Sequence, residues 1–287
     1  MRIIFTADLH YDIPRSRGPT ESVASMINRM DADALVILGD VCAHDLGILR
    51  DCLHFFDAFS GQRFFVAGNH DLWTDGDSLD RYERELKAVC EETGTWYLDA
   101  RPFVRDGVAL VGSMGWYDYS FRVTELGIPL RFYEAKLAPG AAERLAMHHL
   151  LAGAADLDAK MMNIGARWMD GVHVRLPMSD ASFAARLRDR LAEHLRAVGP
   201  DAEHIVVAMH HVPFEAMVRR LHKPVWDFAH AFLGSRIFGE LLLAEPRVRH
   251  VVCGHSHHPS RTRVGHIDCI NVGSTYTVKR VETLDVG

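Results

Sequence analysis

Long apolar runs are absent from this 287-residue sequence, and no window approaches the length that an α-helix needs to cross a bilayer. The N-terminal segment MRIIFTADLH also lacks the apolar stretch and the small-residue cleavage site of a signal peptide. We therefore expect a protein with neither a membrane span nor a secretory leader.

Cysteine is scarce, odd in number and never arranged as a CxxC pair. The five residues are Cys42, Cys52, Cys90, Cys253 and Cys269. Several lie in apolar runs such as RHVVCG, which is typical of buried, reduced thiols rather than of disulfides or thiolate metal sites. This usage predicts a cytoplasmic location.

Positive charge is in deficit, because 32 Lys and Arg against 38 Asp and Glu give a formal net charge of −6. Proteins that hold a nucleic-acid backbone usually carry a basic surface. The balance therefore disfavours long nucleic acids as partners, whereas a small or medium phosphorylated substrate remains compatible with it. Internal repeats and linker-like tracts are also absent, which makes one domain the economical organisation.

Strand-like and helix-like segments alternate along the first hundred residues. The runs RIIFTAD, ALVILGD and RFFVAGN have strand length, and stretches with helical spacing separate them, over 20–30 and after Asp45. This β-α-β-α-β order predicts a largely parallel sheet flanked by helices. TWYLDA, PFVRD and GVALVGS then predict paired strands, with a hairpin turn at Asp106-Gly107 between the last two.

A helix-rich segment over 116–203 follows, without a strand-like run of comparable strength. Its last helix, over about 180–198, has an apolar residue at every fourth position, as core-facing helices do. Strand signals resume at HIVVAMHH and VRHVVCGHSH, and the tail alternates like antiparallel strands. We interpret 1–287 as one domain with 116–203 as a helical insertion; a separate cap domain is the alternative.

Five polar clusters each follow directly on a strand-like run. They are Asp8-Leu9-His10, Gly39-Asp40, Gly68-Asn69-His70-Asp71, His210-His211 and Gly254-His255-Ser256-His257. Ligand sites of open parallel sheets lie outside the carboxyl ends of the strands, so we expect all five clusters to meet at one edge. Carboxylates and imidazoles without thiolates suit divalent Mn, Fe, Zn, Ni or Co.

The spacing within the clusters suggests how ions would be held. Side chains two positions apart on an extended strand point to the same side, so Asp8 and His10 would bind one ion together. The glycines that precede Asp40, Asn69 and His255 would permit turns with positive φ beside the ions. Seven candidate ligands from these five clusters are too many for one ion. A carboxylate that bridges two ions would let the ligands hold both, with the ions about 3.5–4 Å apart.

Taken in order, D-x-H, G-D, G-N-H-D, H and G-H-x-H resemble the motifs of the calcineurin-like metallophosphoesterase superfamily, over about 1–114 and 204–287. The resemblance implies an α/β fold of two mixed β-sheets flanked by helices. It also implies a dinuclear metal-dependent hydrolase of phosphate mono- or diesters, in which a hydroxide held between two divalent ions attacks phosphorus.

The resemblance also implies a role for each matching residue. One ion would be surrounded by Asp8, His10, Asp40 and His257, and the second by Asp40, Asn69, His210 and His255. Asp40 would bridge the two ions. His70 would lie near the leaving-group oxygen, as a proton donor or as a stabiliser of the phosphoryl oxygens.

Several alternatives stay open. His210 and His211 compete for one ligand position, and we favour His210 because it comes first after the strand. His44 and Asp45 would help to orient His70 or the residues around the ligands, or Asp45 would instead cap the next helix, and we favour the cap. A group of aromatic residues would either line a pocket mouth or pack the helical segment onto the sheet; these are Trp116, Tyr117, Tyr119 and Phe121.

Two other functions compete with a small-molecule phosphoesterase. A nuclease of the same superfamily would need a basic groove, which the acidic balance does not favour. A metal-binding scaffold without catalysis would be expected to lack ligands or the proton-donating histidine. Asp40, Asn69 and His70 are all present, so this second interpretation is also disfavoured.

Overall fold

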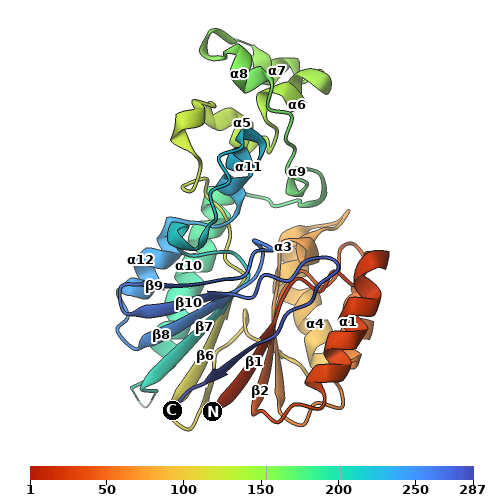
Figure 1. Cartoon of the computed structure of the whole chain (residues 1–287), viewed down its shortest axis with the longest axis vertical. Coiled ribbons are helices and arrows are strands. Elements are labelled where there is room, and N and C mark those ends of the chain that lie inside the picture. Colours follow the sequence, from red (N-terminus) through yellow and green to blue (C-terminus); the bar gives the residue numbers. More distant parts are fainter. Residues whose placement is uncertain (153, 201) are drawn as a thin grey trace.

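Two β-sheets pack face to face, and helices cover the outer face of each sheet (Figure 1). This computed structural model describes residues 1–152, 154–200 and 202–287. The strands are β1 (Arg2–Thr6), β2 (Ala34–Leu38), β3 (Gln62–Val66), β4 (Trp96–Tyr97), β5 (Phe103–Arg105), β6 (Val108–Ser113), β7 (His204–Met209), β8 (Val248–Cys253), β9 (Ser260–Val264), β10 (Ile267–Asn271) and β11 (Glu282–Asp285).

Most helices are short. They are α1 (Pro14–Ile27), α2 (Leu46–His54), α3 (Ser78–Asp80), α4 (Leu86–Glu92), α5 (Leu130–Glu134), α6 (Pro139–Arg144), α7 (His148–Leu151), α8 (Ala159–Met162), α9 (Asp170–His173), α10 (Asp180–Ala197), α11 (Pro224–Ala229) and α12 (Arg236–Leu243). Single 3₁₀ turns are η1 (His70–Leu72), η3 (Thr124–Leu126), η4 (Ala154–Asp156), η5 (Glu215–Met217) and η6 (His230–Phe232), and a π turn is η2 (Arg81–Glu85).

Both sheets mix parallel and antiparallel strands. The first has the order β11-β1-β2-β3-β4, with β11 antiparallel to β1 and the other pairs parallel. The second has the order β5-β6-β7-β8-β10-β9, with antiparallel strands only at its two edges. Two mixed sheets flanked by helices confirm the fold class that the sequence motifs implied.

The apolar runs are continuous because the central strands are buried on both faces. Side chains alternate along β1, so Ile3 and Phe5 pack between the two sheets, whereas Ile4 packs under the helices. On the outer side of the second sheet, α10 buries Phe183 and Leu187 through its four-residue repeat. The strand ends that bear the polar clusters are thereby fixed on a rigid sandwich.

One strand pairing differs from the prediction. The hairpin at Asp106-Gly107 is present, because β5 and β6 pair antiparallel from Arg105 opposite Val108. The TWYLDA run, however, does not join these strands: β4 pairs parallel with β3 at the edge of the first sheet. The prediction of three paired strands was wrong because an apolar-polar alternation specifies a strand but not its neighbour.

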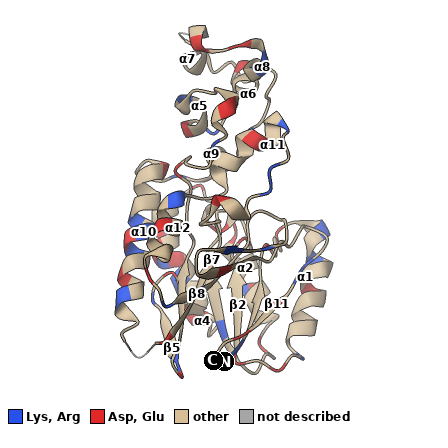
Figure 2. Cartoon of the chain, turned by 60° about the vertical axis from the view of Figure 1, so that its left-hand side comes forward, with Lys and Arg blue, Asp and Glu red and all other residues tan. Residues whose placement is uncertain are grey.

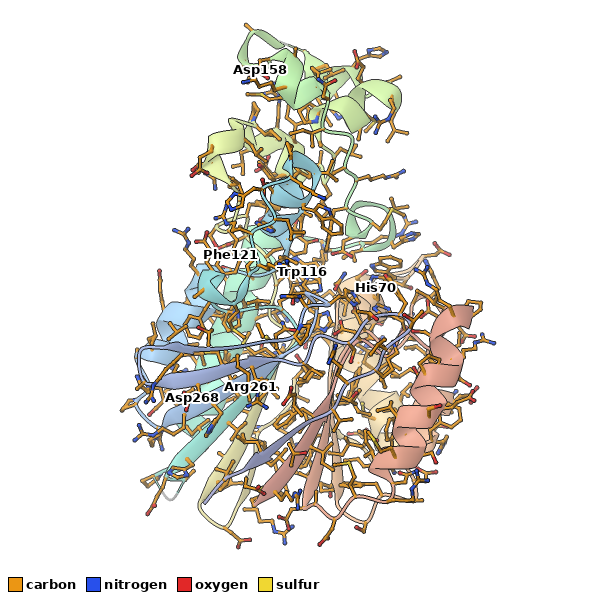
Figure 3. The ribbon with its side chains drawn as sticks, in the orientation of Figure 1. His70, Trp116, Phe121, Asp158, Arg261 and Asp268 are labelled. Atoms are coloured by element: carbon orange, nitrogen blue, oxygen red, sulfur yellow. The ribbon has the colours of Figure 1, made fainter. Side chains whose placement is uncertain are left out.

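The segment 116–203 divides into two parts in space. Helices α5 to α8 stand above the sheets at the top of Figure 1, whereas α10 lies along the second sheet. The aromatic residues at its start are buried, with Trp116 and Phe121 at most 1% exposed, and Figure 3 places both below the upper helices. Trp116 Nε1 donates to Asp180 at 2.8 Å. Trp116 and Phe121 therefore pack the helical segment, whereas Tyr119, whose hydroxyl donates to Asp180, also lines a pocket with Lys136 and Val174.

Two smaller expectations are confirmed by the structure. Asp45 caps α2, since its Oδ1 accepts from the Gly47 nitrogen at 2.8 Å. All five cysteines are buried free thiols. Among the described residues, no helix combines the length and the apolar character that crossing a bilayer requires.

Candidate metal centre

Loops at the carboxyl ends of strands from both sheets meet at one end of the sandwich, where Figure 3 labels His70. The loops after β1 and β2 are hydrogen-bonded to each other, from the Asp8 nitrogen to the Gly39 oxygen at 3.1 Å. The His255 nitrogen, from the second sheet, donates to Asp8 Oδ1 at 3.0 Å. The five clusters therefore share one site, although they span almost the whole chain.

The backbone at this site is left-handed at many of the predicted ligands. Positive φ occurs at Asp8 (55°), His10 (42°), Asp40 (52°), His255 (66°) and His257 (51°). Such φ values are uncommon outside glycine and gather at functional sites, where the surrounding structure holds them. The extended-strand explanation for neighbouring ligands was therefore wrong: β1 ends at Thr6, and the ligands lie in the tight loop beyond it.

The glycines before the ligands matter mainly because a side chain would not fit at their positions. Gly39 has φ +73°, as predicted, but Gly68 and Gly254 do not have positive φ. A Cβ on Gly254 would lie 2.9 Å from Asp8 Oδ2. At these two positions the site needs a missing side chain rather than an unusual backbone angle.

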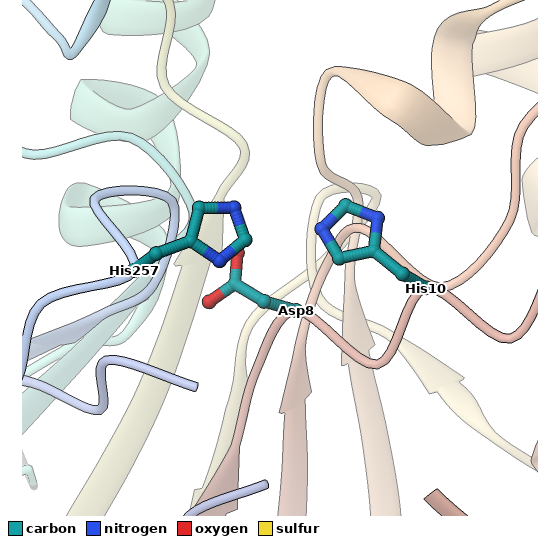
Figure 4. A group of neighbouring side chains, drawn as sticks. All are labelled: Asp8, His10 and His257. Carbon is teal, nitrogen blue, oxygen red and sulfur yellow. The ribbon is translucent and has the colours of Figure 1, made fainter. Parts of the chain in front are cut away.

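One group of possible ligands consists of Asp8, His10 and His257, whose donor atoms lie within 4.8 Å of one another (Figure 4). The Ser274 carbonyl accepts from His257 Nδ1 at 2.7 Å, which directs the other ring nitrogen toward the site. Asp8 Oδ2 and both nitrogens of His10 have no hydrogen-bond partner among the described residues. This group thus presents free lone pairs in a buried place.

A second group consists of Asp40, His210 and His255. His210 Nδ1 donates to the Leu38 carbonyl at 2.8 Å, so its Nε2 turns inward. That Nε2 lies 3.3 Å from Asp40 Oδ1, 3.2 Å from Asn69 Oδ1 and 3.1 Å from His255 Nδ1. Four predicted ligand side chains therefore point at one small volume.

Asp40 lies between the two groups. Its Oδ2 is 3.7 Å from His10 Nε2, and its Oδ1 faces His210 Nε2. His70 Nε2 is 4.0 Å from the same Oδ2, so His70 also falls within ligand distance of the pair His10 and Asp40. The structure brings the carboxylate to the place that a bridge between two ions would need.

Electrostatics at the site favour positive charge. Burial opposes the charge on Asp40, but the imidazoles of His210, His70 and His10 hold the pKa of this carboxyl well below its usual range. Burial also lowers the pKa of His210, yet the carboxylate of Asp40 outweighs burial and raises it to about 9. Burial lowers the pKa of His10 well below its ordinary value. The buried carboxylate of Asp40 thus stabilises a cation beside it, and a divalent ion would take the place of the proton on His210.

His211 lies beside the second group without facing Asp40. Its Nδ1 donates to the Met114 carbonyl at 3.1 Å, and its Nε2 has no partner among the described residues. Its ring lies 4.3 Å from the ring of His255. Burial and the neighbouring His210 lower the pKa of His211 to about 3. Of the two adjacent histidines, His210 is the one directed at Asn69 and Asp40.

His70 lies at the end of a column of rings. It stacks on Trp73 at 3.8 Å between ring centroids, and Trp73 stacks on His173 at 4.4 Å. His44 Nε2 is 3.2 Å from His173 Nδ1. His44 is thus linked to His70 through this column of rings.

Asp71 organises the loops through backbone hydrogen bonds and belongs to neither ligand group. Its carboxylate accepts from the backbone nitrogens of Asp40 at 2.8 Å, Val41 at 2.9 Å and Gly68 at 2.8 Å. One residue was missed altogether: Asp170, in α9, which accepts from Asn69 Nδ2 at 2.9 Å. A lone acid a hundred positions from its partner carries no local sequence signal.

The residues present fit two divalent cations. Buried polar atoms are normally hydrogen-bonded, yet Asp8 Oδ2 and both ring nitrogens of His10 have no partner here, within the described part of the chain. The donors are carboxylate, amide and imidazole, which suit Mn, Fe, Zn, Ni or Co. Asp40 belongs to the second group and also lies 3.7 Å from His10 of the first, so its carboxylate could serve ions in both places.

Comparison with known proteins agrees with this geometry. A sequence model of the family described as calcineurin-like phosphoesterase matches residues 1–259. A curated relative, the transmembrane protein with metallophosphoesterase domain of Bos taurus, is 26% identical over 76 residues, which are 26% of this chain and 17% of that protein. The chain therefore matches only a small part of the length of that relative.

Solved structures with the same fold cover nearly the whole chain. The phosphopantetheinyl hydrolase of Mycobacterium tuberculosis superposes with a TM-score of 0.64 at 18% identity, over 98% of this chain and 95% of that one. A dimetal phosphatase of Danio rerio gives 0.56 at 13% identity, over 99% and 91%. At these identities the likeness establishes the fold alone.

Proposed function

The chain belongs to the calcineurin-like phosphoesterase family, and on this premise we propose that it is a metal-dependent phosphoesterase that hydrolyses phosphate mono- or diesters at a centre of two divalent ions. Asp8, His10 and His257 would hold one ion, and Asn69, His210 and His255 the other. Asp40 would bridge the two ions.

The position of Asp40 is the observation that carries this proposal. Its two carboxylate oxygens face different groups, one at 3.7 Å from His10 Nε2 and the other at 3.3 Å from His210 Nε2. A carboxylate buried to 1% exposure among imidazoles is costly unless cations compensate its charge. A carboxylate between two sets of ligands would hold two ions at the short separation that a dinuclear hydrolase uses.

Each part of the site has a chemical task. When bound, two divalent ions would acidify a water molecule and neutralise charge on the phosphoryl group. Asp40 would fix the distance between the two halves of the site. His70, 18% exposed and beside Asp40, would donate a proton to the leaving-group oxygen or a hydrogen bond to the phosphoryl oxygens. Trp73 restricts the His70 ring by stacking on it.

The substrate is proposed to be small or of medium size. The formal net charge is −6, and Figure 2 shows basic and acidic segments interspersed along α10 rather than gathered into a basic band there. Both features support a small ester over a nuclease substrate. Residues 116–203 are proposed to act as a helical insertion in a single domain, since α9 reaches the loop of Asn69.

Turnover of simple esters tests the proposal. Metal-stripped protein is reconstituted with Mn, Fe, Zn, Ni, Co or Mg and assayed on p-nitrophenyl phosphate, on bis-p-nitrophenyl phosphate and on single-stranded DNA. A phosphopantetheinyl ester is added because one solved structure of this fold is named a phosphopantetheinyl hydrolase. We expect metal-dependent turnover of at least one small ester and none by Asp40→Asn. Turnover of DNA alone would favour the nuclease, and two bound ions without any turnover would favour the scaffold.

A further inference from the structure

Asp170 is a buried carboxylate with four hydrogen-bond donors around it. Its Oδ1 accepts from Asn69 Nδ2 at 2.9 Å and from Trp73 Nε1 at 2.8 Å. Its Oδ2 accepts from Tyr117 at 3.0 Å and from Trp168 Nε1 at 2.7 Å. The residue is only 1% exposed. An ionised carboxylate accepts hydrogen bonds and donates none, so this environment is matched to its charged form.

The contact with Asp170 decides which end of the Asn69 amide faces the site. An amide binds a cation through its oxygen, never through its nitrogen. Because Asp170 can only accept, it must meet the Asn69 nitrogen, and the Asn69 oxygen is left facing His210 Nε2 at 3.2 Å. Rotating the amide by half a turn would place two oxygens against each other and aim the NH₂ group at the ion.

The element that carries Asp170 is attached to the same loop by its backbone. The nitrogen of Thr74 donates to the oxygen of His173 at 3.0 Å, and the nitrogen of Ser78 donates to the oxygen of Arg175 at 3.1 Å. The loop that bears Asn69 and His70 is therefore held against α9 along its length. Asp170 is the point where this contact reaches a proposed metal ligand.

We propose that Asp170 is a positioning residue through which the helical segment sets the affinity of the site for the ion held by Asn69. The inference rests on the proposed dinuclear centre. Removing a residue that orients a metal ligand through a hydrogen bond typically weakens metal binding about 10- to 100-fold. Asp170 would act in this way without touching the ion, the substrate or the reacting atoms.

Asp180 provides a matched control from the same helical segment. It too is a buried aspartate with aromatic donors: it accepts from Trp116 Nε1 at 2.8 Å and from the Tyr119 hydroxyl, and it pairs with Lys136 at 2.5 Å. None of these partners is a proposed metal ligand. A purely structural role for Asp170 predicts that both aspartates behave alike.

The experiment measures Mn²⁺ binding to metal-stripped full-length protein by titration and by metal analysis after dialysis. Asp170→Asn removes the negative charge and one of the two acceptor oxygens that Asn69, Trp73, Tyr117 and Trp168 share. We expect wild type and Asp180→Asn to bind two ions with affinities equal within about twofold. We expect Asp170→Asn to bind one ion normally and the other about 10- to 100-fold more weakly.

Each outcome has a distinct meaning. Wild-type affinity for both ions in Asp170→Asn, or equal weakening in Asp180→Asn, would overturn the inference. Fewer than two ions in wild type would instead overturn the proposed dinuclear centre. If Asp170→Asn does not fold, a Mn-loaded crystal structure of wild type decides: the inference requires the Asn69 oxygen on an ion and the Asn69 nitrogen on Asp170. Loss of that hydrogen bond on loading would contradict it.

Discussion

A Cβ atom on Gly68 would lie 2.2 Å from Oδ1 of Asp40 and 2.3 Å from the Asp40 backbone nitrogen. Real Cβ atoms do not approach other atoms so closely, so the loop after β3 closes on the central carboxylate only because position 68 has no side chain. The same Cβ would lie 2.9 Å from Cε1 of His210. Gly68 thus belongs to the geometry of the centre, although it offers no ligand of its own.

Gly68→Ala should therefore displace Asp40 and weaken both ion sites. We expect fewer than two ions per chain by metal analysis and a loss of turnover of at least about 10-fold, as for other changes that misplace a ligand. Gly18→Ala is the control, because its Cβ would meet nothing within 4 Å in helix α1. It should keep both ions and gain about 0.5–1 kcal/mol of stability. Full metal content in Gly68→Ala would contradict this account of position 68.

His70→Ala should lower turnover by about 10²- to 10⁴-fold and leave the metal content unchanged. The loss should be greater for phenyl phosphate than for p-nitrophenyl phosphate, since the poorer leaving group depends more on a proton donor. His54→Ala, which removes a surface histidine paired with Asp57, serves as the control. Loss of an ion in His70→Ala would instead make His70 a ligand, in keeping with its distance of 4.0 Å from Asp40 Oδ2.

Alanine variants of the adjacent residues His210 and His211 should differ in metal content. His210→Ala removes the nitrogen that faces Asp40 and Asn69, so one ion should be lost. His211→Ala leaves that nitrogen in place and should keep two ions, although the buried cavity that it creates should cost about 1–3 kcal/mol of stability. Metal analysis and thermal unfolding of both variants provide the measurement. The opposite pattern would mean that His211 is the ligand.

Asp99, which belongs to neither ligand group, should make the folding stability depend on pH. It is buried, accepts from the Ala67 nitrogen at 2.9 Å and the Tyr82 hydroxyl at 2.8 Å, and burial raises its pKa from 3.8 to about 6. The folded protein thus holds this proton more tightly than the unfolded chain. The resulting stabilisation is complete below pH of about 4 and is lost as the pH rises through about 6.

Asp99→Asn isolates this contribution, because asparagine does not titrate. Between pH 6.5 and 4.5, metal-stripped wild type should gain up to about 2 kcal/mol of unfolding free energy relative to the variant. Urea unfolding of both proteins at several pH values measures the difference. A difference that does not change with pH would show that Asp99 has an ordinary pKa.

The sequence predicted the chemistry of the site better than its geometry. The motifs from Asp8 to His257 identified the residues that meet at the sheet ends, because parallel strands direct their following loops to one place. They did not predict the backbone there. Left-handed φ at Asp8 and Asp40 depends on contacts between loops, such as the hydrogen bond from the Asp8 nitrogen to the Gly39 oxygen.

Contacts across the chain explain the other differences. Helix α1 begins at Pro14, not near residue 20, because proline is well suited to the first helical turn although the apolar repeat starts later. Trp116 gave equal signals for a pocket and for packing, and only its burial and its bond to Asp180 decide between them. The role of Asp170 depends on its contact with Asn69, which the sequence alone does not indicate.

Anomalous diffraction from Mn-loaded crystals of the full chain tests the central claim most directly. A bridging role for Asp40 predicts two Mn peaks about 3.5–4 Å apart with this carboxylate between them. One peak should lie against His10 and His257, and the other against Asn69 and His210. In Asp40→Asn, at least one of the peaks should disappear. A single peak in wild type, or two peaks that Asp40 does not join, would contradict the dinuclear centre.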